Sequence, residues 1–186
     1  MSTAIWQSGP LRLRPVQAAD LPLFELMGDD IARFCDELQF PQTTERRQAW
    51  LERECKTQFG DTFRWVADTD ASLEAVGTIN TFACSRRHGT FKYGLALARP
   101  YWGQGYARHL ILPVLRFFFL ELGYQKATPH VYAFNERSLL LHRKLGFQEE
   151  GRLRSMIYTG GEYHDEIHFG MTRAEFITRY GTASIE

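Results

Sequence analysis

Polar and apolar residues alternate along the middle of the chain, and this period of two gives way to a helical period at Gly105. Alternation is typical of strands with one buried face, whereas apolar residues at every third or fourth position indicate a helix. The predicted strands cover residues 63–68, 76–83, 88–98, 127–133, 147–158 and 167–172. The predicted helices cover residues 105–123, which Pro113 bends, and residues 135–145.

The amino-terminal part of the chain predicts one edge strand and two helices. Leucines alternate with arginines from residue 11 until Pro15 ends the strand. Asp20 is expected to cap a helix that ends at residue 27, and Thr44 to cap a second helix that ends near residue 59. At the other end of the chain, residues 181–186 are expected to fray.

These elements predict an α+β fold with a mixed, mostly antiparallel central sheet and helices on both faces. The strand at 127–133 is expected to lie beside the strand at 88–98, and a glycine turn at 159–162 to join the last two strands. Nothing in the sequence resembles a linker or a repeat, so we expect a single domain over residues 1–186.

The segment YWGQGYA, residues 101–107, joins the strand at 88–98 to the long helix. Gly103 and Gly105 permit positive φ and leave the main-chain amides accessible at a helix N-terminus, where partial positive charge favours anions. This pattern predicts a site for a diphosphate. Tight connections between strands and helices also use glycine for steric reasons alone, and that alternative stays open at this point.

Composition narrows the possible partners. Lysine plus arginine and aspartate plus glutamate both number 22, so no net field favours nucleic acid or an anionic membrane. The widely spaced Cys35, Cys55 and Cys84 indicate free thiols in a reducing compartment, and we expect a cytoplasmic protein. The first residues lack the basic, apolar and small-residue succession of a secretory leader, and the longest apolar run is too short to span a bilayer, so we expect neither export nor membrane insertion.

The glycine turn, the segment NERSLLLHRKLGFQEEGRLR at 135–154, and the later Gly161 and Asp165 together resemble the GNAT superfamily of N-acetyltransferases. Within it, they resemble the branch of ribosomal-protein N-terminal acetyltransferases (RimJ/RimL-like). The resemblance covers roughly residues 75–172. It implies transfer of an acetyl group from acetyl-CoA to a primary amine, by default the α-amine of a protein or peptide N-terminus, by direct attack on the thioester.

The resemblance implies two sets of residues that bind acetyl-CoA. Main-chain amides of the turn hold the diphosphate, and main-chain amides at Leu97 and its neighbour Ala96, splayed by a bulge, stabilise the thioester oxygen. Asn135 adds a contact to the pantetheine arm. The residues expected at the turn are Trp102, Gly103, Gln104, Gly105, Tyr106 and Ala107.

Two positions depart from the patterns of the superfamily and the branch. Trp102 stands where the superfamily often has arginine or glutamine, so no charged side chain assists the phosphates there. Arg108 offers a replacement charge or is a solvated helical arginine. His109 stands where the branch often has glutamate, which puts a glutamate-dependent role at that helix face in doubt.

Proton transfer is assigned to one face of the helix at 135–145. Asn135, Ser138 and His142 recur at intervals of three and four and therefore share that face. His142 stands where many members of the superfamily have a tyrosine that protonates the CoA thiolate, so Ser138 or His142 is the expected acid. The alternatives are that Asn135 acts only as a helix cap, and that Ser138 and His142 have no catalytic task.

A general base is harder to assign from the sequence. A protein α-amine has a pKa of about 8, so water can suffice. The candidates by location are Glu37, His130, Glu162 and His164, while Asp165 is expected to orient the hairpin or the amine. We expect no metal, because His164 and His168 lie about 13 Å apart on a strand and the cysteines lack paired spacing.

Several alternatives remain at this stage. A non-catalytic acyl-CoA sensor needs the same glycine turn, although the polar face at 135, 138 and 142 favours an enzyme. A dinucleotide-binding unit is excluded, because its glycines would follow the first strand of a parallel unit. Small amines and aminoglycosides are alternative acceptors, and we expect residues 28–40 and 158–165 to select among them. Both a monomer and a homodimer are compatible with the sequence.

Overall fold

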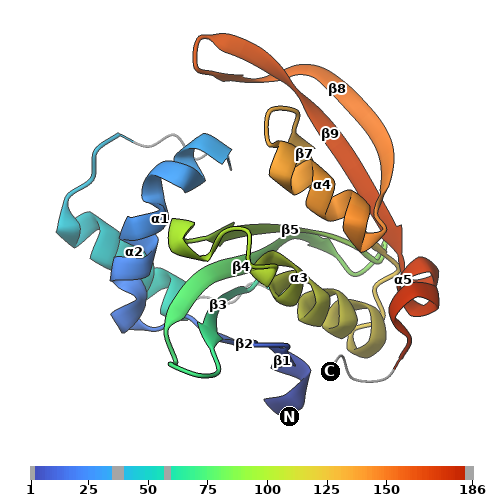
Figure 1. The fold of residues 1–186 in the computed structure, drawn as a ribbon, viewed down its shortest axis with the longest axis horizontal. Coiled ribbons are helices and arrows are strands. Elements are labelled where there is room, and N and C mark those ends of the chain that lie inside the picture. The colour runs from blue at the N-terminus through green and yellow to red at the C-terminus, as the bar shows by residue number, and fades with distance from the viewer. Residues whose placement is uncertain (1–2, 35–39, 57–59, 183–186) are drawn as a thin grey trace.

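The computed structural model describes residues 3–34, 40–56 and 60–182 (Figure 1). Its helices are α1 (Leu21–Phe34), α2 (Thr44–Lys56), α3 (Tyr106–Arg116), α4 (Glu136–Leu145) and α5 (Arg173–Tyr180). Its strands are β1 (Gln7–Ser8), β2 (Leu11–Pro15), β3 (Arg64–Thr69), β4 (Ala75–Ser85), β5 (Thr90–Leu97), β6 (Lys126–Ala127), β7 (His130–Tyr132), β8 (Gln148–Thr159) and β9 (Glu162–Thr172). No helix in these ranges is long and apolar enough to cross a membrane.

The strands form one mixed sheet in the order β1-β2-β3-β4-β5-β6-β9-β7, with β8 paired to β9. Every pairing among the described strands is antiparallel except that of β5 with β6. Helices cover both faces (Figure 1). The predicted fold class is therefore confirmed.

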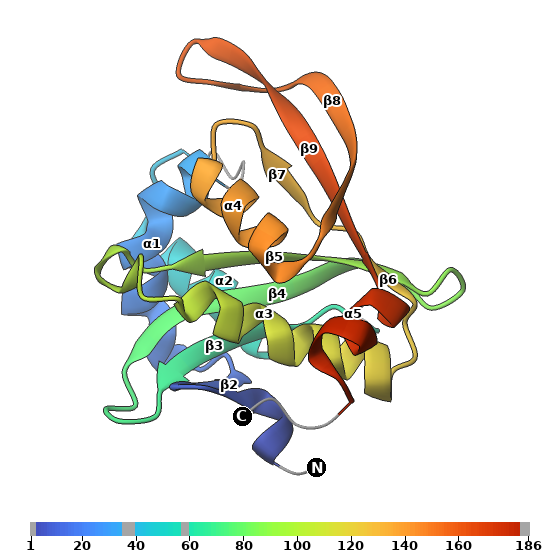
Figure 2. The same ribbon diagram turned by 45° about the vertical axis from the view of Figure 1, so that its right-hand side comes forward.

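The sheet opens between β5 and β7, and the predicted pairing of residues 127–133 with β5 holds only at its start, in β6. The expected strand at 127–133 divides into β6 and β7 around Pro129, which has no N–H to donate. Only Thr90 and Phe91 of β5 pair with β6, and β7 pairs with β9 instead, with Val131 opposite Ile167. Beyond Phe91, β5 and β7 diverge from each other (Figure 2).

Two apolar clusters lie on opposite faces of the sheet. The larger cluster packs α3, α4 and α5 against one face through residues such as Trp65, Leu110 and Phe169. The smaller cluster packs α1 and α2 against the other face through Met27, Leu51 and their neighbours. Strand β3 is buried on both faces, with Val66 in the smaller cluster and Trp65 in the larger. The helices α1 and α2 thus have a core of their own.

The first helices begin differently from the prediction. The Asp20 carboxylate accepts from the Gln17 amide at 2.7 Å and lies in a 3₁₀ turn, Ala18–Asp20, so it does not cap α1. Helix α1 continues to Phe34, about two turns beyond the predicted end at residue 27. The Arg46 amide donates to the Thr43 hydroxyl at 3.3 Å, so the cap of α2 lies one residue before Thr44.

The long helix and the carboxyl-terminal elements also differ from the prediction. Helix α3 ends at Arg116 and continues as a π turn, Phe117–Glu121, in which the Leu122 amide reaches the Phe117 carbonyl. Strand β9 starts at Glu162, five residues earlier than predicted, because it pairs with the whole length of β8. Helix α5 was not predicted, although the Thr172 and Glu175 capping box is a readable start signal.

A buried ion network fastens β2 to β3 and to the turn before α1. The Arg14 guanidinium donates to both oxygens of Asp20 at 2.7 and 2.8 Å and to Asp68 at 2.6 Å. Asp20 and Asp68 are each 4% exposed, so their charges have little access to water. Their hydrogen bonds raise the pKa of Arg14 far above the physiological range, and the arginine stays charged.

We expect Arg14→Met to lower the free energy of unfolding by about 3–5 kcal/mol, because two buried carboxylates lose their countercharge. Arg12→Met on the exposed face of the same strand is the matched control and should change stability by no more than about 0.5 kcal/mol. Urea denaturation of both variants measures the difference. Equal stabilities would show that the network contributes nothing.

Candidate active site

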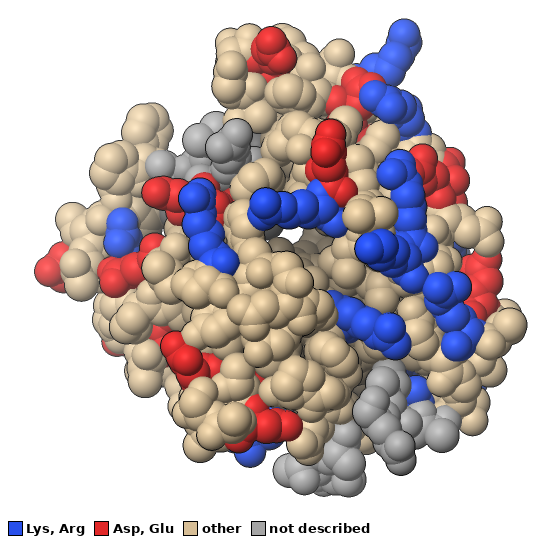
Figure 3. All heavy atoms as spheres, in the orientation of Figure 1, with Lys and Arg blue, Asp and Glu red and all other residues tan. Residues whose placement is uncertain are grey.

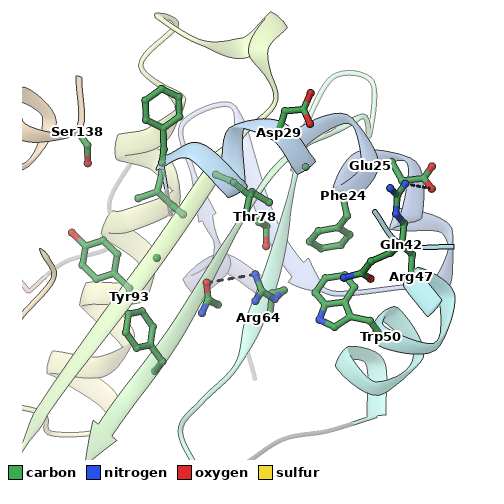
Figure 4. Close-up of a pocket in the computed structure, with 18 of the residues that line it drawn as sticks. Phe24, Glu25, Asp29, Gln42, Arg47, Trp50, Arg64, Thr78, Tyr93 and Ser138 are labelled. Carbon is green, nitrogen blue, oxygen red and sulfur yellow. Dashed lines mark hydrogen bonds and ion pairs between the residues drawn. The ribbon is translucent and has the colours of Figure 1, made fainter. Parts of the chain in front are cut away.

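A cavity of about 930 Å³ occupies the opening between β5 and β7 and continues under α1 and α2 (Figure 4). One part, which we call the α4 arm, is bounded by β5, β7 and α4 and includes Asn135, Ser138 and His142. The other part, the α2 arm, is bounded by β3, β4, α1 and α2 and includes Arg64, Trp50 and Phe24. The edge of β5 lies between the two arms.

The glycine turn has the geometry of an anion site. Gly103 and Gly105 have φ of +78° and +81°, and a Cβ on either would meet no protein atom within 4 Å. The conformation therefore requires glycine, and the space beside it is open. Among the described residues, the amides of Gly103, Gln104 and Gly105 have no protein acceptor. They lie at the N-terminus of α3, whose partial positive charge suits a diphosphate.

Trp102 links this turn to α4. Its indole nitrogen donates to the Leu97 carbonyl at 2.6 Å, while the Arg137 and Arg99 guanidinium carbons lie 4.9 and 5.7 Å from its ring centroid. Arg137 therefore reaches the turn from α4, and Arg99, the second residue after β5, reaches it while paired with Asp30 at 2.8 Å. Figure 3 shows Lys and Arg side chains gathered around an opening on this face. The sequence reading missed Arg99 and Arg137, which sit beside the tryptophan that replaces the usual charged residue.

Arg108 and His109 have other contacts. The Arg108 guanidinium lies over the Tyr180 ring of α5, at 5.9 Å from its centroid. His109 Nδ1 lies 3.0 Å from the Ser8 hydroxyl of β1, and burial lowers the pKa of His109. His109, which replaces the glutamate often found in the branch, therefore packs α3 against β1.

The amides of Leu95 and Leu97 face the opening. Leu97 lies opposite Gly77, and the next residue, Ala98, donates to the Val76 carbonyl at 2.9 Å. Leu97 thus belongs to a non-hydrogen-bonded antiparallel pair, so its N–H and C=O point away from β4. Leu95, opposite Ile79, belongs to a pair of the same kind, and its N–H and C=O also point away from β4. No described strand pairs with this stretch on the opposite side.

The structure differs from the expected oxyanion site in two details. The register between Gly77 and Leu97 runs without irregularity to Phe82 and Lys92, so the amides are freed by strand divergence and no bulge is involved. The Ala96 amide points toward β4, opposite Thr78, and is not available. Gly77 permits β4 and β5 to approach closely at this point, because a Cβ on Gly77 would lie 2.5 Å from the Ala96 carbonyl oxygen.

Asn135 and Ser138 lie at the start of α4 and line the cavity. The Asn135 side-chain oxygen accepts from the Ser138 amide at 3.2 Å, so Asn135 is the helix cap. Its amide nitrogen has no described partner and remains available. The Ser138 hydroxyl lies 3.4 Å from His142 Nδ1 and borders the α4 arm (Figure 4). Capping and ligand binding are therefore compatible at Asn135.

His142 is unsuited to the acid role. It is 3% exposed and packs against the rings of Tyr93, Phe147 and Phe169. Burial lowers its pKa to about 4, so the ring is neutral near pH 7. Its Nδ1 lies 2.8 Å from the Ser138 carbonyl, which only accepts, so Nδ1 carries the single proton and Nε2 has none to give. Of the two side chains, only Ser138 therefore has a proton to donate toward the cavity.

Tyr93 is a residue that the sequence reading did not select for the site. It is 4% exposed and lines the cavity beside His142. The Tyr93 hydroxyl and His142 Nε2 are both buried without a described partner. Burial raises the pKa of Tyr93 well above its ordinary value, so the phenol keeps its proton as a potential donor. Two orphaned polar atoms here fit a polar ligand that runs through the opening.

The candidate bases are spread out. Of the described candidates, only His130 lines the cavity; Glu162 and His164 lie along the hairpin outside it, and Glu37 falls outside the described residues. Burial and the Lys92 ammonium, 3.4 Å from Nδ1, lower the pKa of His130 and keep it neutral. The ammonium can only donate, so Nδ1 accepts and the neutral ring carries its proton on Nε2, which leaves His130 without a free acceptor for a proton from the amine.

Asp165 has a structural role in the hairpin. It accepts from the Ser155 amide at 2.9 Å and from Arg152 at 2.6 Å, which hold its pKa below the usual value. Ser155 has a positive φ at the register shift of β8, so Asp165 fastens an irregular strand. The described residues contain no group of three or more side chains suited to a metal.

The sequence profile of the acetyltransferase (GNAT) domain family matches residues 10–148. The chain belongs to the GNAT family. The uncharacterized N-acetyltransferase YokL, from an SPbeta prophage of Bacillus subtilis, is 45% identical over 97% of this chain and the whole of that protein. The spermidine N(1)-acetyltransferase of Vibrio cholerae is 27% identical, covering 62% of this chain and 66% of that one.

A solved structure shares the fold. The spermidine N-acetyltransferase of Vibrio cholerae in complex with CoA and spermine superposes with a TM-score of 0.78 at 22% identity, covering 90% of this chain and 98% of that one. As a GNAT member, this acetyltransferase is an enzyme that uses acetyl-CoA as co-substrate. The non-catalytic sensor is therefore set aside. These relatives support the superfamily and do not single out the ribosomal-protein branch.

The anion site makes a test of affinity possible. We expect Gly105→Val to weaken coenzyme A binding by about tenfold or more, a cost of about 1.4 kcal/mol, because the turn must reorganise and a side chain enters the open space. Gly160→Val is the matched control, since Gly160 also has a positive φ and open surroundings but lies in the hairpin turn. Calorimetric titration with coenzyme A should show the loss only for the first variant. Equal losses would exclude the turn as the binding site.

His142 makes a test of pH dependence possible. Its pKa falls from about 6.5 in the unfolded chain to about 4 in the folded enzyme, so protonation favours unfolding. The stability due to the neutral ring is complete above pH 6.5 and declines toward pH 4, by up to roughly 3 kcal/mol. We expect His142→Phe to remove this part of the decline in urea denaturation at pH 7.5 and 4.5. Equal declines in both proteins would mean that His142 is not titrating as described.

Proposed function

We propose that this acetyltransferase moves the acetyl group directly from acetyl-CoA to a primary amine that reaches the β5 edge through the α2 arm. The observation that supports this most is the position of the unpaired Leu95 and Leu97 amides, between the anion-binding turn and Ser138. Diphosphate binding at one end fixes the co-substrate, and a polar helix face borders the other. The amine then has one approach left, over the opposite face of β5.

Different residues bind the co-substrate and transfer the protons in the proposed reaction. Amides of residues 103–107 hold the diphosphate, and the Leu97 amide donates to the thioester oxygen as negative charge develops there. The Asn135 side-chain amide holds the pantetheine arm, while Ser138 donates a proton toward the departing thiolate. His142 positions Ser138 by its hydrogen bond to the Ser138 carbonyl, 2.8 Å long. Water beside His130 removes the proton from the amine, and this proton returns through water to Ser138 to replace the one given to the thiolate.

Gly94 marks the path of the acceptor. Cross-strand pairing places Arg64, Asn80 and Gly94 in one row, so they share the sheet face that is covered by α1 and α2. Gly94 is the last residue of the row before the open edge and carries no side chain. A substrate can therefore cross the strand here and bring its nitrogen to the thioester.

The acceptor class remains a proposal. A cavity of about 930 Å³ can hold either a small amine or the first residues of an extended peptide, in keeping with the usual size of ligand pockets. The names of two relatives suggest polyamines, whereas the branch resemblance suggests a protein α-amine. A reducing, cytoplasmic setting would suit the unpaired Cys55 and Cys84.

The direct test follows CoA thiol release from acetyl-CoA against peptides, polyamines and aminoglycosides, with mass spectrometry of each acceptor. We expect acetylated primary amines and stoichiometric thiol. Coenzyme A binding without release for any amine would contradict the proposal.

We expect Ser138→Ala to lower kcat on the order of a hundredfold, because the thiolate loses its proton donor, and to leave the KM for acetyl-CoA nearly unchanged. Steady-state kinetics with saturating amine measures both constants. Ser72→Ala, in the turn between β3 and β4, is the control. A wild-type kcat in Ser138→Ala would assign the proton to water.

A further inference from the structure

Arginines dominate the α2 arm among the described residues. Arg46, Arg47, Arg53 and Arg64 line it, against the carboxylates of Glu25 and Asp29. Arg47 lies 3.2 Å from Glu25, so that carboxylate is already paired. The described part of the arm therefore carries an excess of positive charge, which opposes a polycationic ligand.

Arg64 is the arginine built into the arm. Its guanidinium donates through Nε to Glu54 at 2.7 Å and through Nη1 to Asn80 at the long distance of 3.5 Å. It lies 5.8 Å from the Trp50 ring centroid, and its side chain is 19% exposed. Figure 4 shows Arg64 between Thr78 and Trp50 on the cavity wall.

Most of the donor capacity of Arg64 is unused. A guanidinium has five N–H donors, and the described residues accept from two of them. Nη2 has no described partner. A planar fork with unused donors in a partly desolvated wall is suited to a carboxylate, which it can bind through two parallel hydrogen bonds.

The spacing to the reaction centre is set by the sheet. Arg64, Asn80 and Gly94 are consecutive neighbours across β3, β4 and β5, and adjacent strands lie about 4.8 Å apart. The guanidinium reaches toward Asn80, so it lies one to two strand spacings, roughly 5–10 Å, from the β5 edge. An acceptor bound at both places would have its amine and its anionic group separated by that distance.

We propose that the acceptor is a primary amine that also carries a carboxylate, which Arg64 binds in the α2 arm while the amine lies at the β5 edge. The inference rests on the proposed acetyl transfer and adds the charge of its substrate. An ω-amino acid and a peptide N-terminus with an acidic residue near the amine both present this chemistry. It differs from the polyamines in the names of the relatives.

The test compares acceptors that differ in one charge. Ser-Glu-Ala-Ala amide is paired with Ser-Gln-Ala-Ala amide, ε-aminocaproate with its amide, and spermidine is included. We expect kcat/KM to be about tenfold or more higher for a carboxylate than for its amide, as for hydrogen bonds to charged groups. The peptide and aminocaproate pairs show which source of the carboxylate is preferred. Acetylation of spermidine above all of these would overturn the inference and leave the proposed acetyl transfer intact.

Variants locate the effect. Arg64→Gln should reduce the carboxylate-to-amide ratio to about one, whereas Arg64→Lys should keep part of the preference. Glu54→Gln breaks the same ion pair but leaves the cation, so it should preserve or increase the ratio. If Arg64→Gln and Glu54→Gln lowered the ratio equally, the preference would come from the ion pair and the inference would fail. Wild-type ratios near one would refute it directly, whereas failure to acetylate any amine would refute the acetyl transfer itself.

Discussion

The divergence of β5 from β7 is the constraint on which the rest of the site depends. A strand inside a sheet uses its amides on both sides, and β5 loses its partner after Phe91. The amides of Leu95 and Leu97 are left to a ligand without any irregularity in β5. Pro129 separates β6 from β7, and β9 then takes β7 as its neighbour. One break in pairing thus creates both the opening and the donors within it.

In the proposed transfer the enzyme contacts its co-substrate largely through main chain, and the side chains set the protonation and charge of the surroundings. Burial holds His142 neutral and keeps the Tyr93 phenol protonated. The same exclusion of water strengthens the main-chain donors at the edge of β5. Arg137 near Trp102 adds charge without occupying the turn itself, whereas the charge of Arg99 is paired with Asp30. The proposed transfer therefore assigns the acid to the Ser138 hydroxyl at the start of α4, where the Asn135 cap fixes the backbone.

Much of the fold could be predicted from local patterns in the sequence. Alternation and helical periods predicted β3, β4, β5, α3 and α4, and the glycine turn marked the strand and helix that it joins. The pairing of β7 could not be read in this way, because alternation gives a buried face and no partner. The protonation state of His142 was equally hidden, since it depends on rings from β5 and β9 that are distant in sequence. Arg64 was not selected from the sequence, because its proposed role depends on Asn80 and Gly94, which are its neighbours only across the sheet.

The two apolar clusters on opposite faces of the sheet have an evolutionary consequence. Helices α1 and α2 pack through the smaller cluster, whereas α4 belongs to the larger one and Tyr101 of the turn packs against both. Helix α1 also contacts the turn region, where Asp30 binds Arg99 at 2.8 Å and the Phe34 ring lies against the Trp102 ring. Replacement of residues on the inner side of α2 can therefore reshape the acceptor arm with little effect on the turn. Divergence of acceptor preference among homologues with one common scaffold is the expected outcome of such a division.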